Sequence, residues 1–145
     1  MFTKRNAIRS SSLGRMLVIL MSVGLLVAGC TATDTSTSVR LVSAEEAAAV
    51  ISDAPPGQIV LDVRTPEEFR EAHIADATLV DFYDSDFRDQ IAALDRDVSY
   101  VLYCRSGNRS AEAARLMDDL GFRSVDEIDG GILSWMEAGL PVVSP

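Results

Sequence analysis

From residue 39 onward, apolar and polar positions follow two alternating periodicities, one typical of strands and the other of helices. Short continuous apolar runs predict strands at 39–42, 59–63, 98–103 and 125–128, with a weaker one at 77–82 that contains an aspartate. Continuous apolar character is expected of strands that are buried on both faces of a parallel sheet.

Helical spacing and helix-start signals fall between these runs. Ser43 with Glu46 and Thr65 with Glu68 have the spacing of capping boxes, and Pro66 suits the first position of a helix. The predicted helices cover 44–52, 66–72, 84–94 and 110–120, and a last helix follows Gly130-Gly131 and runs through Trp135 and Ala138. Strands that alternate with helices predict an α/β sandwich with a mostly parallel sheet.

The first 29 residues have the pattern of a signal peptide. A basic leader precedes an apolar run at 16–28, whose 13 residues would span only about 20 Å as a helix, short of a hydrocarbon core of about 30 Å. Residues 27–30 at its end, Val-Ala-Gly-Cys, resemble the bacterial lipobox and imply that Cys30 becomes the lipid-modified N-terminus. An ordinary secretory peptide and a membrane-spanning helix are the alternatives.

This interpretation divides the chain into a lipoprotein signal peptide (1–29), a flexible polar tether from Cys30 (30–38) and a folded domain (39–145). The expected location is extracytoplasmic, anchored to a bacterial membrane through the lipid alone.

Charge excludes several classes of partner. The chain carries a net charge of −9, and removal of the leader would leave nine basic against 22 acidic side chains, a net charge of −13. So acidic a protein is unsuited to nucleic-acid binding, and it lacks the basic residues for a polybasic contact with a membrane.

Cysteine usage directs attention to one residue. If Cys30 is acylated, Cys104 is the remaining thiol, with no partner for an internal disulfide and no second cysteine for a metal site. A free cysteine in an oxidising compartment is either buried as a small core residue or used chemically.

The position of Cys104 favours chemical use. It directly follows the strand predicted at 98–103, and a helix is expected about five residues later. Ligands of parallel sheets bind beyond such strand ends, where loop amides and the positive end of a helix stabilise anions. Both effects favour the thiolate, and Arg105 and Arg109 add charges that would hold an anionic substrate.

Three segments together resemble the single-domain rhodaneses, the thiosulfate sulfurtransferase-like family. They are LDVRTPEEFREAHI (61–74), CRSGNRSAEAARLMDDLGF (104–122) and DGGILSWMEAGLPV (129–142), and the resemblance covers about residues 39–145. It implies a three-layer sandwich around a five-stranded, mostly parallel sheet. It also implies transfer of sulfane sulfur from a small sulfur-containing anion such as thiosulfate to a thiol or cyanide acceptor, without a metal or organic cofactor.

The resemblance also implies roles for individual residues. Cys104 is the nucleophile that carries the persulfide, and Asp62 and Arg64 brace the active loop. His73 is expected to be structural, and Trp135 to be a packing residue. The substrate cradle, formed mainly by backbone donors, consists of Arg105, Ser106, Gly107, Asn108 and Arg109.

The chain departs from the family pattern after the segment at 61–64. Ala72 and Asp76 occupy positions where the family usually has glycine, and Leu-Val-Asp at 79–81 replaces the frequent Asn-Ile-Pro. These changes affect the rim of the expected site, whereas the loop that begins at Cys104 keeps the family pattern.

Two alternatives to sulfur transfer remain open. Cysteine-dependent phosphatases and some arsenate reductases use the same strand-loop-helix arrangement, with an arginine six residues after the cysteine. Here that position is Ser110, and Arg109 comes five residues after Cys104, so the cradle is narrower and suits a sulfur atom. The other alternative is a non-catalytic rhodanese module that binds a partner, although such a module would not need the cysteine.

Overall fold

Five parallel strands form the centre of the fold in the computed structural model, which describes residues 38–145. Their order across the sheet is β1-β5-β4-β2-β3, and every neighbouring pair runs parallel. The predicted α/β fold with a five-stranded, mostly parallel sheet is therefore confirmed. The strands are β1 Val39–Val42, β2 Ile59–Asp62, β3 Thr78–Leu79, β4 Ser99–Tyr103 and β5 Ser124–Ile128.

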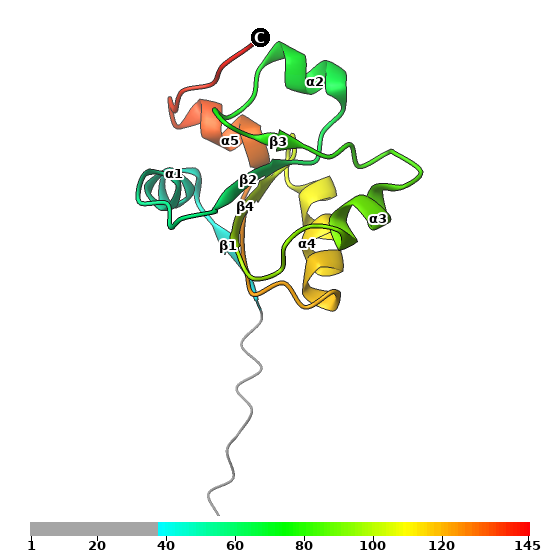
Figure 1. The fold of residues 1–145 in the computed structure, drawn as a ribbon. Helices are drawn as coiled ribbons and strands as arrows, with labels where there is room; N and C mark the ends of the chain where they lie inside the picture. The colour runs from blue at the N-terminus through cyan, green and yellow to red at the C-terminus, as the bar shows by residue number, and fades with distance from the viewer. Residues whose placement is uncertain (1–37) are drawn as a thin grey trace, which may run out of the picture. The chain divides into compact units, whose positions relative to one another are not determined.

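Helices cover both faces of the sheet and make the three layers (Figure 1). One face packs against α1 (Ala44–Ser52) and α5 (Gly131–Glu137), and the other against α3 (Phe87–Ala92) and α4 (Asn108–Asp119). The remaining helix, α2 (Pro66–Glu71), lies at one end of the sheet. Each face thus has its own apolar core, and the central strands are buried between the two.

The helix starts that the sequence marks most clearly are confirmed. In both predicted capping boxes, the side chain of Ser43 or Thr65 accepts from the backbone N–H three residues later, and Glu46 or Glu68 accepts in return from the cap N–H. These contacts satisfy the free N–H groups of α1 and α2.

Two predicted elements are shorter than expected. The strand predicted at 77–82 covers only Thr78–Leu79, which form the edge of the sheet and pair with β2 alone. The helix predicted at 84–94 covers only Phe87–Ala92, and Asp86 at its N-terminal cap makes no side-chain hydrogen bond to the helix. Edge position and a weak cap explain why sequence patterns overestimate both elements.

One helix begins earlier than predicted. The helix expected from Ser110 begins at Asn108, because Gly107 adopts a left-handed conformation (φ +96°) that turns the chain directly into the helix. Asn108 and Arg109, which were expected in the loop, therefore belong to the first turn of α4. The loop between β4 and α4 is thus confined to residues 104–107.

The expectations for residues 1–29, for Cys30 and for most of the tether lie outside the described residues. Within residues 38–145, no helix combines the length and the apolar character needed to cross a membrane.

Candidate active site

The loop after β4 wraps around the sulfur of Cys104. The backbone N–H of Gly107 donates a hydrogen bond to Cys104 Sγ, with the nitrogen 3.2 Å from the sulfur. The hydroxyl of Ser110, in the first turns of α4, lies 3.5 Å from the same sulfur. We call residues 104–110 the collar, because their donors surround one sulfur atom.

The collar favours the ionised form of a buried thiol. The side chain of Cys104 is only 1% exposed and contacts the apolar core on the α4 side of the sheet. Burial by itself would raise the pKa of the thiol, but the Ser110 hydroxyl and the amides of Ser110, Ser106 and Gly107 more than offset it. The pKa of Cys104 is therefore lower than that of an ordinary cysteine.

The start of α5 fixes the collar from behind. Ile132 N–H donates to the Cys104 carbonyl at 2.9 Å, and Leu133 N–H donates to the Arg105 carbonyl at 3.2 Å. This approach requires a glycine at 131, because a Cβ there would overlap the Cys104 carbonyl oxygen. The Gly-Gly segment noted in the sequence thus lets the helix hold the loop.

The two arginines of the collar have different surroundings. Arg109 makes a two-pronged ion pair with Glu68 of α2, with N–O distances of 2.7 and 2.8 Å, and Tyr83 lies over its guanidinium. These hydrogen bonds lower the pKa of Glu68 to about 2. By contrast, Arg105 is exposed, and its side chain lines a cavity of about 350 Å³ with residues of α2 and α5. Arg105 is thus the arginine that can reach an incoming anion.

Asp62 and Arg64 form a buried ion pair at the end of β2. The guanidinium donates to both carboxylate oxygens at 2.6–3.0 Å and also to the Ala72 carbonyl at 2.7 Å. The link to the collar runs through the backbone, since Val63 N–H donates to the carbonyl of Tyr103, the residue before the cysteine. The pair therefore ties β2 to the segment after α2 and lies beside the collar.

Two residues at the site were not identified from the sequence. Ser110 contacts Cys104 Sγ, and its hydroxyl donates to the carboxylate of Glu127 on β5 at 2.8 Å. In the sequence, Ser110 was only the position at which phosphatases have arginine, and Glu127 was one polar residue in a predicted strand. A charged residue inside a strand expected to be buried is the signal that could have identified Glu127.

The remaining residues singled out in the sequence make structural contacts. His73 Nδ1 hydrogen-bonds the Phe69 carbonyl at 2.9 Å, and the two rings stack 3.8 Å apart. Trp135 is buried and donates its indole N–H to the Pro141 carbonyl at 2.9 Å. Among residues 38–145, no three acidic, histidine or cysteine side chains cluster closely enough to hold a metal ion.

Comparison with known proteins gives a consistent result. The model of the rhodanese-like domain matches residues 43–138. A sulfurtransferase of Allochromatium vinosum is 38% identical over 87 residues, which are 60% of this chain and 79% of the relative. A rhodanese-related protein from Thermoplasma volcanium has a similar structure, with a TM-score of 0.63, 36% identity, and coverage of 72% of this chain and 97% of the other. A Rhodopseudomonas palustris protein described as a possible tyrosine phosphatase is also similar in structure, with a TM-score of 0.61 and 26% identity. The match covers 73% of this chain and 86% of that protein.

Proposed function

We propose that this chain, which belongs to the rhodanese-like domain family, is a sulfurtransferase that carries sulfane sulfur as a persulfide on Cys104. The observation that supports the proposal most directly is the collar, which places a backbone N–H donor and the Ser110 hydroxyl within hydrogen-bonding distance of a single sulfur atom. A cysteine persulfide is an anion like the thiolate, so the same donors would stabilise both forms.

The first half of the reaction loads the cysteine. The Cys104 thiolate attacks the outer sulfur of an anionic donor such as thiosulfate, a new S–S bond forms, and the old S–S bond of the donor breaks. The electron pair of that bond leaves with the departing sulfite. Arg105 is placed at the rim, where its charge attracts the donor and stabilises the leaving anion.

The second half regenerates the thiolate. An acceptor, either a thiolate or cyanide, attacks the outer sulfur of the persulfide, and the electron pair of the broken S–S bond returns to Cys104. No outside oxidant or reductant is needed, because in each step one anion attacks the outer sulfur and another anion leaves with the electron pair of the broken S–S bond. The persulfide places its reactive sulfur about 2 Å beyond Sγ, where an acceptor can reach it more easily.

Access is the main structural demand on this mechanism. Because Cys104 is 1% exposed, the donor must displace part of the collar before it meets the sulfur. The exposed side chains of the loop are Arg105 and Ser106, whereas Gly107 and Arg109 are partly buried. Movement of the two exposed residues would open a path without breaking the ion pair of Arg109.

Phosphatase-like chemistry, the alternative enzyme class, has less support from the geometry. Such enzymes need an arginine that is free to bind a tetrahedral oxyanion inside the loop. Arg109 is already bound to Glu68 through two hydrogen bonds, and the position after it is Ser110. A collar that has only Arg105 free at its rim suits a sulfur donor better than a phosphate ester.

Intact-mass measurement of the purified protein after treatment with thiosulfate tests the proposal. We expect a gain of one sulfur atom, which is lost when cyanide is added and thiocyanate appears. Cys104→Ser should show neither change and keep its circular dichroism spectrum. Transfer that persists in this variant, or a wild-type protein that gains no sulfur, would contradict the assignment. Hydrolysis of an aryl phosphate by the wild type would instead support the phosphatase class.

We also propose that the domain is displayed outside the cytoplasm as a lipoprotein, with residues 1–29 removed and Cys30 acylated. The support is the sequence pattern at 16–30. Mass spectrometry of the processed N-terminus in a bacterial host should find diacylglyceryl-modified Cys30, and Cys30→Ala should abolish the lipid and release the protein from membranes. An N-terminus at any other residue would refute lipid modification at Cys30.

A further inference from the structure

The hydroxyl of Ser110 has more acceptors than it can serve. Its oxygen lies 2.8 Å from Glu127 Oε1, 3.0 Å from the Gly107 carbonyl oxygen and 3.5 Å from Cys104 Sγ. A serine hydroxyl carries one hydrogen. Whichever of these acceptors is most negative therefore decides where that hydrogen points.

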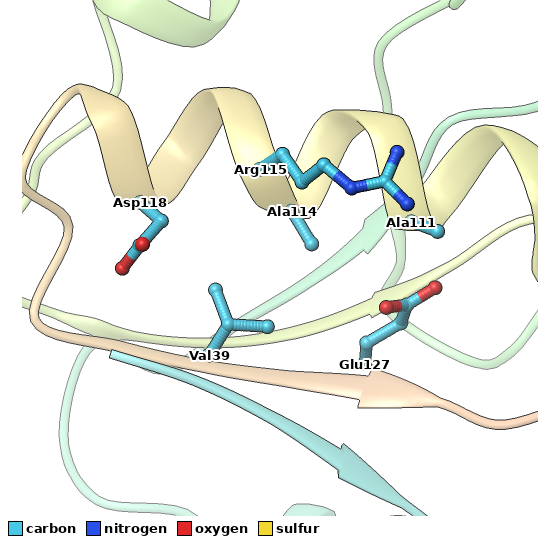
Figure 2. Close-up of a pocket in the computed structure, with 6 residues that line it drawn as sticks. All are labelled: Val39, Ala111, Ala114, Arg115, Asp118 and Glu127. Atoms are coloured by element: carbon cyan, nitrogen blue, oxygen red, sulfur yellow. The ribbon is translucent and has the colours of Figure 1, made fainter. Parts of the chain in front are cut away.

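Glu127 is a buried carboxyl in an apolar setting. It is 6% exposed, and its neighbours in the sheet are Leu41 of β1 and Leu102 of β4. Its carboxyl group points from β5 towards the first half of α4, beside Ala111 (Figure 2). Without a full ion pair, a carboxyl group in this position is costly to ionise.

The charged groups that face Glu127 are few. Arg115 and Asp118 on α4 line the same cavity of about 260 Å³, and Asp129 comes directly after the end of β5. From β1, the apolar Val39 also lines this cavity. Burial raises the pKa of Glu127, against the opposing effects of the Ser110 hydroxyl and Arg115. The neutral acid is thus more accessible here than for an exposed glutamate.

We propose that Glu127 is a positioning residue that controls the ionisation of Cys104 through the Ser110 hydroxyl. When Glu127 is ionised, it takes the Ser110 hydrogen, and the thiolate loses that donor. When Glu127 is protonated, its own O–H donates to Ser110 Oγ, and the serine hydrogen turns to Cys104 Sγ. The inference depends on the proposed function only in treating Cys104 as the reacting sulfur.

The same contacts define a balanced proton transfer. The Cys104 thiol gives its proton to Ser110 Oγ while Ser110 passes its hydroxyl proton to Glu127. The products are a thiolate, a neutral carboxylic acid and an unchanged serine, so no further reactant is needed. The new serine O–H then points at the thiolate, as it does whenever Glu127 is protonated.

Glu127 has its own contact with solvent for proton exchange. The cavity that it lines shares no residue with the cavity beside Arg105. Protons can therefore reach Glu127 between β1 and α4, while the sulfur donor approaches from the Arg105 side. This separation allows the sulfur to be deprotonated while a substrate covers the collar.

The pH dependence of iodoacetamide alkylation, followed by mass spectrometry on the Cys104 peptide, tests the inference. Glu127→Gln keeps the shape and mimics the protonated acid. We expect its alkylation midpoint to fall by about one pH unit, which means about tenfold faster alkylation below the midpoint, as expected for one hydrogen bond to an anion. Ser110→Ala removes the donor and should raise the midpoint.

The double variant separates the serine route from a direct effect of charge. In the Ser110→Ala background, Glu127→Gln should shift the midpoint by much less than it does alone. An equal shift in both backgrounds would show that the charge acts through space and would overturn the proposal, as would no shift in Glu127→Gln alone. Asp118→Asn, which removes another carboxylate from the same cavity, should leave the midpoint unchanged. Because alkylation needs no sulfur donor, it reports on Glu127 even if the protein transfers no sulfur.

Discussion

Asp62 and Glu127 are both buried carboxyl groups near the end of a strand, yet their surroundings differ sharply. Asp62, 0% exposed, accepts hydrogen bonds on both oxygens from the Arg64 guanidinium and another from the Arg64 backbone N–H. Glu127, 6% exposed, has one hydrogen-bond donor, and Ser110 divides that hydrogen among three acceptors.

The difference separates a structural charge from a functional one. A carboxylate whose two oxygens both accept from one guanidinium holds that guanidinium in place, so Asp62 and Arg64 can anchor the segment at Ala72. A buried carboxyl group with one shared donor takes up a proton more readily than an exposed one. Incomplete hydrogen bonding near a reactive sulfur is therefore more informative about chemistry than a strong ion pair.

The largest expected effect on stability comes from breaking the Asp62–Arg64 ion pair. Arg64→Met leaves Asp62 buried without a counterion, which should destabilise the protein by about 3–5 kcal/mol. Glu127→Gln, which keeps a hydrogen bond to Ser110, should change stability by less than about 1 kcal/mol. Urea denaturation followed by circular dichroism measures both values.

A matched exposed ion pair provides the control. Arg123 pairs with Asp97 at 2.9 Å, but both side chains are largely exposed, so Arg123→Met should cost no more than about 1 kcal/mol. If Arg64→Met and Arg123→Met lower the free energy of unfolding by the same amount, burial does not strengthen the Asp62–Arg64 pair. The contrast drawn between Asp62 and Glu127 would then be wrong.

The fold could be predicted from the sequence because its signals are local. Capping boxes at Ser43 and Thr65 and continuous apolar runs depend on neighbours a few residues away, and both are observed. The short elements Thr78–Leu79 and Phe87–Ala92 were overestimated because an edge position and a weak cap depend on the tertiary structure.

The site was predicted only in part, for a physical reason. Cys104 was identified because a strand, a cysteine and a helix start are consecutive in the sequence. Glu127 lies 23 residues further along and meets the collar only because β5 is next to β4 in the sheet. Likewise, the partner of Arg109 could not be predicted, since Glu68 lies 41 residues earlier. Contacts that depend on strand order are not visible in residue spacing.

A second, smaller effect is the pH dependence of the stability that the Glu68–Arg109 ion pair adds. Arg109 lowers the pKa of Glu68 to about 2, so the stability that this ion pair adds is complete above the unfolded pKa of about 4.3 and is lost as the pH falls towards 2. Glu68→Gln should therefore cost about 1–2 kcal/mol at neutral pH and almost nothing near pH 2. Urea denaturation over this pH range measures the difference.

The stability difference between the wild type and Glu127→Gln should depend on pH in the opposite direction. Because burial raises its pKa, the wild type is favoured over Glu127→Gln at low pH and loses that advantage as the pH rises through the pKa of Glu127 in the folded state. If the stability differences for Glu68→Gln and Glu127→Gln changed with pH in the same direction, the distinction between an arginine-paired carboxylate and a buried carboxyl without an ion pair would be contradicted.

The smallest expected effect concerns the segment that Arg64 anchors. Asp76 adopts a left-handed conformation (φ +60°) in the turn closed by the Ala77 N–H to Ile74 carbonyl hydrogen bond, at a position where glycine is favoured. Asp76→Gly relieves this strain but adds freedom to the unfolded chain, so the net gain should be about 0.5 kcal/mol. Asp76→Ala should lose a similar amount, because alanine tolerates this conformation less well than aspartate. The order of stability should be glycine, aspartate, alanine in thermal unfolding. Equal stability of all three would mean that the anchored segment relaxes, and that the Asp62 and Arg64 pair does not hold it rigid.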